Sequence, residues 1–136
     1  MRIFLDANIL FSAARSDGAV RRFLHDLAAR GHVPCADGYV AEEARRNLAA
    51  KAPQALASLA LLLDRVEVAS LQAPTTTLPS LAALPEKDRP VMVAAVRMRC
   101  DVLVTGDRTH FGAFYGRRLA GISIHSPRSL AEALLP

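Results

Sequence analysis

The sequence predicts an α/β fold with a mainly parallel sheet. Short apolar runs typical of buried strands alternate along the chain with longer segments whose apolar residues recur at helical spacing. The clearest strand is the run at residues 102–104, and strands that alternate with helices favour parallel pairing. The 136 residues, 51% of them hydrophobic, can bury one sizeable core. We therefore expect a single domain over residues 1–136.

The first half of the chain predicts three strands and four helices. Strands are expected at residues 1–5, 32–35 and 66–69. Helices are expected up to residue 14, from residue 16 or 17 to 30, at 37–51 and from residue 53 to about 63. Gly31 ends the second of these helices, Asp37 can cap the third and Pro53 can begin the fourth.

The second half of the chain predicts two more strands and two helices. The segment at 73–85 is rich in proline and threonine and is expected to form a loop. A helix at about 86–99 then leads into a strand at 101–105. A last strand at 121–125 precedes a helix that Pro127 can open.

Carboxylates occur near the ends of the predicted strands. Asp6 follows the apolar run at 1–5 directly, and Asp107 lies just beyond the strand at 101–105. The carboxyl ends of parallel strands meet at one edge of an α/β sheet, where ligands bind. Asp88 lies in the first turn of the helix that precedes the 101–105 strand and reaches the same edge. We therefore expect these three carboxylates to share a cleft.

A fourth acid is expected from the helix that Asp37 caps. The helix contains Glu42 and Glu43, and its apolar stripe includes Val40 and Ala44. Glu43 lies one position from the stripe on one side, whereas Glu42 lies two positions from Val40 on the other. The spacing alone does not choose between the two glutamates.

Clustered carboxylates predict a metal site. They repel one another, and burial raises their pKa values unless a cation compensates. Oxygen ligands without a cluster of His or Cys favour Mg²⁺ or Mn²⁺ over zinc, and such ions promote hydrolysis at phosphoryl groups. The formal charge of +4, with fifteen arginines among 17 basic residues, favours a polyanionic partner. The pattern predicts a metal-dependent hydrolase that acts on nucleic acid.

Four segments in order carry a resemblance to a known family. They are LDANIL at residues 5–10, VAEEARRNL at 40–48, EKDRPVMVAA at 86–95 and LVTGDRTHF at 103–111. Together they resemble the acidic motifs of PIN-domain ribonucleases, many of whose bacterial members are toxins of VapBC-type toxin-antitoxin pairs. Each motif alone is weak, but four in order with the family spacing are specific.

The resemblance implies which residues form the site. It implies that Asp6, Glu43, Asp88 and Asp107 are the catalytic and metal-binding acids. It also implies that Asn8 and Thr105 are polar residues that support the site. Glu43 is favoured over Glu42 because the family glutamate stands five residues before an apolar residue, as Glu43 does before Leu48. Arginines beside these motifs are the candidate RNA contacts, namely Arg45, Arg46, Arg89 and Arg108.

The resemblance also implies a fold, an activity and partners. The fold is a three-layer α/β/α domain, PIN-like, with a mainly parallel sheet of five strands. The activity is that of a Mg²⁺- or Mn²⁺-dependent endoribonuclease, which hydrolyses RNA phosphodiester bonds without a covalent intermediate. The implied partners are RNA, a second copy in a homodimer, and a small antitoxin protein that enters the acidic cleft.

Plainer explanations exist for each acid taken singly. Asp88 can be a solvated helix cap and Asp107 a turn residue, and either glutamate can pair with Arg46 on a solvated helix face. These explanations do not account for four acids at one edge. By contrast, His110 and His125 are expected to be surface or packing residues rather than ligands.

Two other functions compete with the nuclease. A phosphatase of the haloacid-dehalogenase type also has an aspartate after its first strand, but it needs a second aspartate two residues later, where this chain has Asn8. A PIN-like module that binds RNA or protein without cleavage would lack some of the acids, and all four are present.

The sequence also predicts where the protein resides. No apolar run approaches the ~20 residues of a membrane span, and Asp6 falls where a signal peptide would be apolar. Cys35 and Cys100 form no CxxC motif or disulfide framework, which fits a reducing compartment and predicts packing roles. We therefore expect a cytoplasmic protein with no membrane contact.

Overall fold

The structure, a computed structural model, describes residues 1–70 and 81–136. Its strands are β1 (Arg2–Leu5), β2 (Val33–Asp37), β3 (Glu67–Ala69), β4 (Val102–Val104), β5 (Arg118–Leu119) and β6 (Ile122–His125). Its α-helices are α1 (Ala7–Arg15), α2 (Ala19–Ala29), α3 (Gly38–Lys51), α4 (Leu56–Leu63), α5 (Arg89–Arg97), α6 (Arg108–Phe111) and α7 (Pro127–Leu134). Short 3₁₀ turns cover Pro53–Ala55, Glu86–Asp88 and Gly112–Phe114. Among the described residues, no helix has the length and apolar character that crossing a membrane requires.

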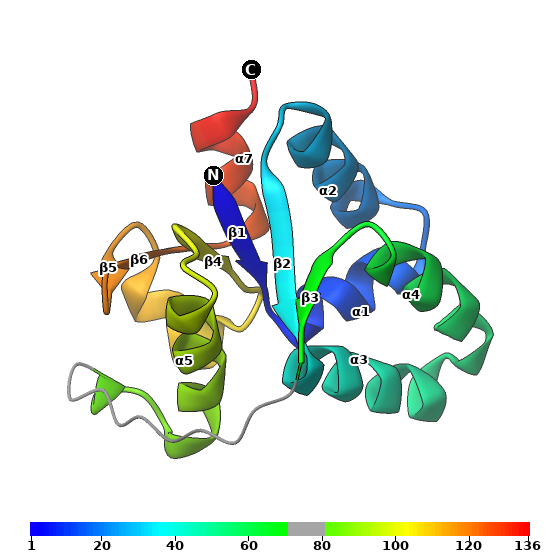
Figure 1. The fold of residues 1–136 in the computed structure, drawn as a ribbon, viewed down its shortest axis with the longest axis horizontal. Helices are drawn as coiled ribbons and strands as arrows, with labels where there is room; N and C mark the ends of the chain where they lie inside the picture. Colours follow the sequence, from blue (N-terminus) through cyan, green and yellow to red (C-terminus); the bar gives the residue numbers. More distant parts are fainter. Residues whose placement is uncertain (71–80) are drawn as a thin grey trace.

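The strands form one sheet in the order β3-β2-β1-β4-β6-β5. All neighbours pair in parallel except β5 and β6, which are antiparallel. Helices α1 to α4 lie to one side of the sheet and α5 to the other, so the fold is a three-layer α/β/α sandwich, as the sequence predicted (Figure 1). The chain proceeds outward from β1 through β2 to β3 and then returns to β4 on the other side of β1. In such a sheet, the crevice at this reversal of strand order is the usual ligand site.

The structure differs from the sequence prediction in two places. The sheet has six strands instead of five, because the two-residue β5 is too short to leave a sequence signal. The helix expected at 86–99 begins as a 3₁₀ turn, and regular α-helix starts only at Arg89. Most of the predicted loop at 73–85 lies outside the described residues, but Leu81 and Leu84 at its end are buried.

Local signals explain why the helices begin where they do. Asp37 ends β2, and its Oδ1 accepts a hydrogen bond from the Val40 N–H (3.1 Å), which satisfies a free donor of α3. At α7, Ser126 and Ser129 form a reciprocal capping box ahead of the first turn. Gly31 adopts a φ of 86° after α2, a left-handed conformation that favours glycine.

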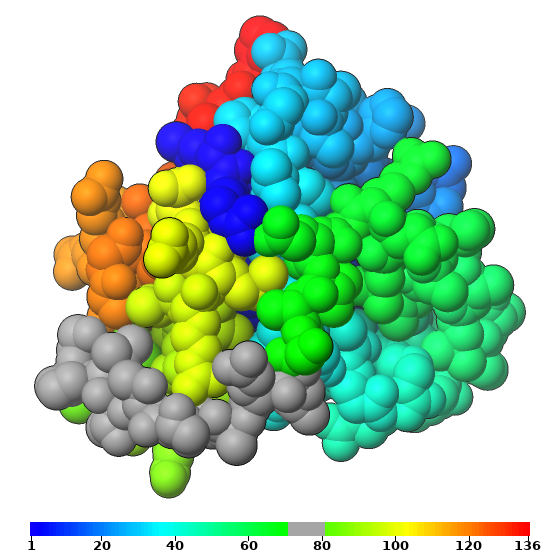
Figure 2. Space-filling view, in the orientation of Figure 1, coloured from blue at the N-terminus to red at the C-terminus, as the bar shows by residue number. Residues whose placement is uncertain are grey.

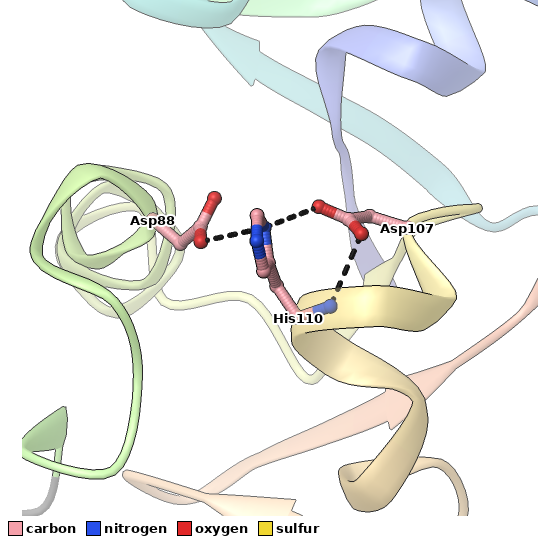
Figure 3. A group of neighbouring side chains, drawn as sticks. All are labelled: Asp88, Asp107 and His110. Atoms are coloured by element: carbon pink, nitrogen blue, oxygen red, sulfur yellow. Dashed lines mark hydrogen bonds and ion pairs between the residues drawn. The ribbon is translucent and has the colours of Figure 1, made fainter.

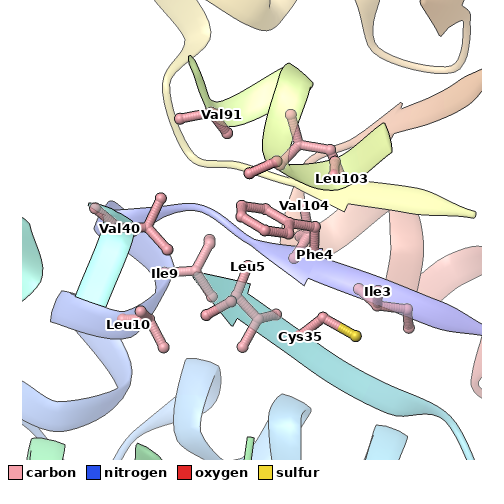
Figure 4. Close-up of a cluster of buried hydrophobic side chains, with 14 of the residues drawn as sticks. Ile3, Phe4, Leu5, Ile9, Leu10, Cys35, Val40, Val91, Leu103 and Val104 are labelled. Atoms are coloured by element: carbon pink, nitrogen blue, oxygen red, sulfur yellow. The ribbon is translucent and has the colours of Figure 1, made fainter. Parts of the chain in front are cut away.

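The hydrophobic core lies on both faces of the central strands (Figure 4). Phe4 and Leu5 of β1 and Leu103 of β4 are fully buried. Cys35 and Cys100 are buried free thiols, in keeping with their predicted packing roles. Buried strands flanked by helices on both sides read as continuous apolar runs, which is why these strands were visible in the sequence.

The first strand is held at its amino end by distant segments. The Arg2 N–H donates to Asp101 Oδ2 (2.8 Å), and Arg2 Nε donates to the Met98 carbonyl (2.9 Å). The Val33 N–H donates to the Met1 carbonyl (2.8 Å). Figure 2 shows the N-terminal residues in dark blue lying between β2 in cyan and the residues near position 100 in yellow. These contacts align β1 between β2 and β4.

Leu103→Ala tests whether the centre of the sheet carries the core. Leu103 is fully buried in β4, and its truncation leaves a cavity, so we expect a loss of about 2–5 kcal/mol in unfolding free energy. Leu61→Ala is the matched control, because Leu61 is 69% exposed and its truncation is expected to cost less than about 0.5 kcal/mol. Urea denaturation of both variants measures the difference. Equal losses would contradict the assignment of the core.

Candidate metal centre

Asp6 occupies the point at which β1 passes into α1. Its N–H donates to the Val104 carbonyl of β4 (3.1 Å), and its Oδ1 accepts from the Ala7 N–H (2.8 Å), so the carboxylate caps α1. Its Oδ2 accepts from the Thr105 hydroxyl (2.8 Å). Asp6 is only 6% exposed, and these hydrogen bonds offset part of the cost of burying a carboxylate.

A bridge of polar groups joins the carboxyl ends of β1 and β4. Asn8 Nδ2 lies within donor distance of Asp6 Oδ2 (3.2 Å) and Thr105 Oγ1 (3.3 Å), and Asn8 Oδ1 accepts from the Gly106 N–H (2.8 Å). Thr105 Oγ1 also accepts from the Asp107 N–H (3.1 Å). A Cβ at Gly106 would meet Asn8 Oδ1 at 3.3 Å, so glycine suits this close approach. Asn8 and Thr105 therefore position Asp6 and Asp107.

The two glutamates of α3 have different surroundings. Glu43 is half-buried and lines the same cleft as Asp6. Glu42 is exposed, and its Oε2 accepts from Arg45 Nε at 2.8 Å. The rotation of α3 that buries Ala44 turns Glu43 inward and Glu42 outward. The geometry thus makes Glu43 the site candidate, a choice that spacing left open.

Asp88 and Asp107 face each other across His110 (Figure 3). His110 Nδ1 lies 2.9 Å from an Oδ2 of each aspartate, and Asp107 Oδ1 accepts from the His110 N–H (3.1 Å). The expectation that His110 is a surface or packing residue is wrong, because its ring lies between two acids of the cleft. The expectation for His125 agrees with its place, since His125 Nδ1 lies 2.9 Å from Ser129 Oγ at the start of α7.

The donor atoms around His110 fit a divalent cation. Asp88, Asp107 and His110 each offer one ligand atom, and these atoms lie within 4.8 Å of one another. Asp88 Oδ2 and His110 Nδ1 are buried and lie 2.9 Å from each other, yet in the part of the chain that the structure describes neither forms a hydrogen bond. Buried polar groups are rarely left unsatisfied, and one explanation is an ion. The carboxylate oxygens of Asp88 and Asp107 suit the Mg²⁺ or Mn²⁺ that the sequence predicts, and His110 adds a nitrogen donor that suits transition metals.

Burial dominates the electrostatics of the other two acids. Burial raises the pKa of Asp6, the hydrogen bonds from Thr105 and Ala7 lower it, and the charges of Asp107 and Asp88 raise it further. Burial also raises the pKa of Glu43, and the charges of Asp6 and Asp88 act in the same direction. The charges of these carboxyl groups therefore raise one another's pKa values across the cleft, as expected of clustered acids.

The acidic cleft has a volume of about 350 Å³. Its lining includes residues that the sequence analysis did not single out, namely Phe11, Tyr39, Asn47, Lys51, Lys87 and His110. A signal for three of them was present, because Tyr39, Asn47 and Lys51 repeat at four-residue spacing from Glu43 along one face of α3. No comparable signal marks His110, which reaches the cleft only through the placement of α6.

The four arginines predicted to contact RNA do not line this cleft. Arg45 is directed elsewhere, because it pairs with Glu42 on the exposed face of α3 and lines a groove against α4. Arg89 is half-buried, and its Nε donates to a backbone carbonyl of the preceding turn (3.2 Å). Arg46 and Arg108 are exposed beside the acidic motifs.

Comparison with known proteins identifies the family. The sequence model described as "PIN domain" matches residues 2–109. The chain therefore belongs to the PIN-domain family, as its four acidic motifs predicted. Nucleases of this family use divalent metal ions, and the Asp88, Asp107 and His110 group is able to hold one. A search among curated proteins finds no match.

Two solved structures show the same fold. A chain in the crystal structure of VapBC2 from Rickettsia felis, bound to a DNA fragment from its promoter, aligns with a TM-score of 0.70 and 18% identity over 93% of this chain and 98% of that one. VapC20 of Mycobacterium tuberculosis, a toxin that cleaves the sarcin-ricin loop, aligns with a TM-score of 0.57 and 15% identity over 88% and 98%. At these identities, the likeness establishes the fold.

Asp6→Asn tests the cost of burying the Asp6 carboxylate. Because the pKa of Asp6 is raised on folding, the native state binds the proton more tightly, and ionisation destabilises it as the pH rises. In EDTA, we expect the melting temperature of Asp6→Asn minus that of the native protein to be greater at about pH 7 than at about pH 5.

The comparison across pH isolates the charge. Any change in hydrogen bonding that the new amide causes is the same at both pH values, so it cancels when the two differences in melting temperature are compared. The exposed Asp17→Asn variant is a control for losing one surface charge. A difference in melting temperature that does not change with pH would contradict the effect of burial.

Proposed function

We propose that this protein is a divalent-metal-dependent endoribonuclease and the toxin of a toxin-antitoxin pair. One observation carries the proposal. Four carboxylates from four different parts of the chain line one cleft at the carboxyl ends of β1 and β4, and two buried polar atoms there form no hydrogen bond in the part of the chain that the structure describes. This arrangement suits cation binding, and the family membership supports the reaction class.

The proposed roles of the residues follow from their positions. Asp88, Asp107 and His110 hold the cation, with Asp6 and Glu43 on the flanks of the same cleft. When bound, a divalent ion acidifies water and offsets negative charge on a phosphoryl group. The acids act as ligands and not as nucleophiles, so hydrolysis proceeds without a covalent intermediate.

Asn8 argues for the nuclease and against a phosphatase of the haloacid-dehalogenase type. Its amide lies beside Asp6 and Thr105, and its carbonyl accepts from the Gly106 backbone. An amide in this bridge cannot serve as a general acid. The position that a phosphatase of that type would use for proton transfer is therefore structural.

The choice of RNA and of an antitoxin partner rests on the solved structures. VapC20 is a toxin that cleaves the sarcin-ricin loop, which is RNA, and the structure from Rickettsia felis is that of VapBC2 bound to DNA of its promoter. We extend RNA cleavage and an antitoxin partner to this chain as proposals, together with a homodimer and a cytoplasmic location. Lys51 and Lys87 line the cleft, and Arg46 and Arg108 lie exposed beside the acidic motifs, so these cations are placed to hold a polyanion.

Added metal tests the cation site. A ligand that binds only the folded state stabilises it by mass action, by about 2.7 kcal/mol at one hundred times its dissociation constant. We expect Mn²⁺ or Mg²⁺ to raise the melting temperature of the EDTA-treated protein and Asp107→Asn to remove most of this rise. Glu42→Gln is the control that retains the rise. A melting temperature indifferent to both ions would refute the site.

The glutamates of α3 offer a matched test of catalysis. We expect Glu43→Gln to lower metal-dependent cleavage of RNA by roughly 100-fold or more, because it removes a charge beside the cation. Glu42→Gln makes the same chemical change on the exposed side of the helix and is expected to stay within a few-fold of the native rate.

Asp6→Asn should abolish cleavage while RNA binding persists, since reduced repulsion of phosphate favours binding.

A panel of tRNA, mRNA and single-stranded DNA, incubated with and without EDTA, provides the measurement. Expression of the native chain alone should arrest growth, and expression of Asp6→Asn should not. Cleavage that persists in EDTA, or that survives in Asp6→Asn, would falsify the mechanism. Metal-independent binding without cleavage would favour the PIN-like binding module instead.

A further inference from the structure

Phe11, which lines the cleft, contacts two cations: Lys51, which also lines the cleft, and Arg15, which does not. The ring is half-buried on α1, and it lies 5.7 Å from Arg15 Cζ and 5.8 Å from Lys51 Nζ, measured to its centroid. Both distances fall within the range of a cation–π interaction. Arg15 comes from the last turn of α1 and Lys51 from the last residue of α3, so two separate helices bring positive charge to one ring.

The cleft connects this cationic end to the acids. Tyr39, Glu43, Asn47 and Lys51 line it at successive four-residue intervals along α3. Two turns of helix separate Glu43 from Lys51, which corresponds to about 12 Å. Phe11 lies on the facing helix, α1, one turn beyond Ala7 and Asn8. The cleft therefore changes from negative to positive charge over a short distance.

Helix dipoles explain only part of this arrangement. A cation in the last turn of a helix is favoured by the partial negative charge there, and this accounts for Arg15 and Lys51 singly. Arg15 reaches Phe11 from one turn further along α1, whereas Lys51 reaches the same ring from α3 and brings a second positive charge to it. Neither residue forms an ion pair with a carboxylate among the described residues, and both are exposed. Lys51 lines the end of the cleft, and Arg15 lies beside it against the ring of Phe11, so two exposed cations without a carboxylate partner in the described part of the chain flank a place where an anion can bind.

We propose that Arg15 and Lys51 bind a backbone phosphate of an RNA strand whose scissile phosphate lies at the acids, with Phe11 holding both cations in place. This inference rests on the proposed nuclease function and adds the course of the substrate along α1 and α3. The cleft has a volume of about 350 Å³, within the range of small-molecule pockets and large enough for one nucleotide. The proposed substrate is single-stranded at the cut, where one nucleotide enters the cleft.

Salt-dependent binding tests the phosphate seat directly. The probe is a fluorescein-labelled single-stranded RNA of mixed sequence, titrated against Asp6→Asn protein at several KCl concentrations. Each phosphate contact contributes about 0.7 to the slope of log affinity against log salt for a single strand. We expect Arg15→Gln and Lys51→Gln each to lower the slope by about that amount. Lys51→Arg and Arg15→Lys should retain the slope, because they keep the charge.

Arg45→Gln is the matched control, since Arg45 also lies on α3 but pairs with Glu42 away from the cleft. It should leave the slope unchanged, and melting temperatures establish that every variant is folded. In the otherwise native enzyme, Arg15→Gln and Lys51→Gln should raise KM with little change in kcat, as expected of residues that position the strand.

The outcomes separate this inference from the proposed function. Unchanged slopes in both Gln variants, with cleavage intact, would overturn the phosphate seat alone. A reduced slope without any metal-dependent cleavage would retain the seat and refute the nuclease. A self-complementary duplex that binds with the same slope and the same losses would overturn the assignment of a single-stranded substrate.

Discussion

The hydrogen bond between Asp6 and Thr105 is the contact on which the rest of the site depends. It joins the carboxyl ends of β1 and β4, two neighbouring strands that are about a hundred positions apart in the sequence. A buried carboxylate needs donors, and Asp6 receives them from Thr105, Ala7 and Asn8. Because the same threonine accepts from the Asp107 N–H, one buried acid also sets the position of a second.

At the other side of the cleft, the repulsion between carboxylates is reduced in a different way. His110 lies between Asp88 and Asp107 and contacts both carboxylates at 2.9 Å, an ion pair when its ring is protonated. A divalent cation carries more charge and satisfies atoms that lack hydrogen bonds. The cluster is thus a place where the fold accepts a local loss of stability that a bound ion can restore.

The charge of the cleft changes from negative to positive along its length. Its acidic end lies at the reversal of strand order, where the carboxyl ends of β1 and β4 and the start of α1 meet. Its cationic end lies where α1 and α3, which pack side by side, both terminate near Phe11. In the function that we propose, the cationic end attracts the phosphate chain and a metal ion at the acidic end offsets its repulsion.

The sequence by itself determined the α/β class, the ends of most elements and the presence of Asp6, Asp88 and Asp107 at one edge of the sheet. These features follow from local periodicity, from caps such as Asp37 and from the common edge that parallel strands share. The four-residue repeat of Tyr39, Glu43, Asn47 and Lys51 along α3 is also present in the sequence.

Only the tertiary structure decided which strands are neighbours, which glutamate faces the cleft and how His110 comes to lie between two aspartates. Spacing left Glu42 and Glu43 equivalent, because helix periodicity places a stripe but packing against α1 sets the rotation that turns Glu43 inward. His110 meets Asp88, and Lys51 meets Phe11, only because segments far apart in the chain pack together. Contacts of this kind depend on how whole elements pack, and no local pattern of residues encodes them.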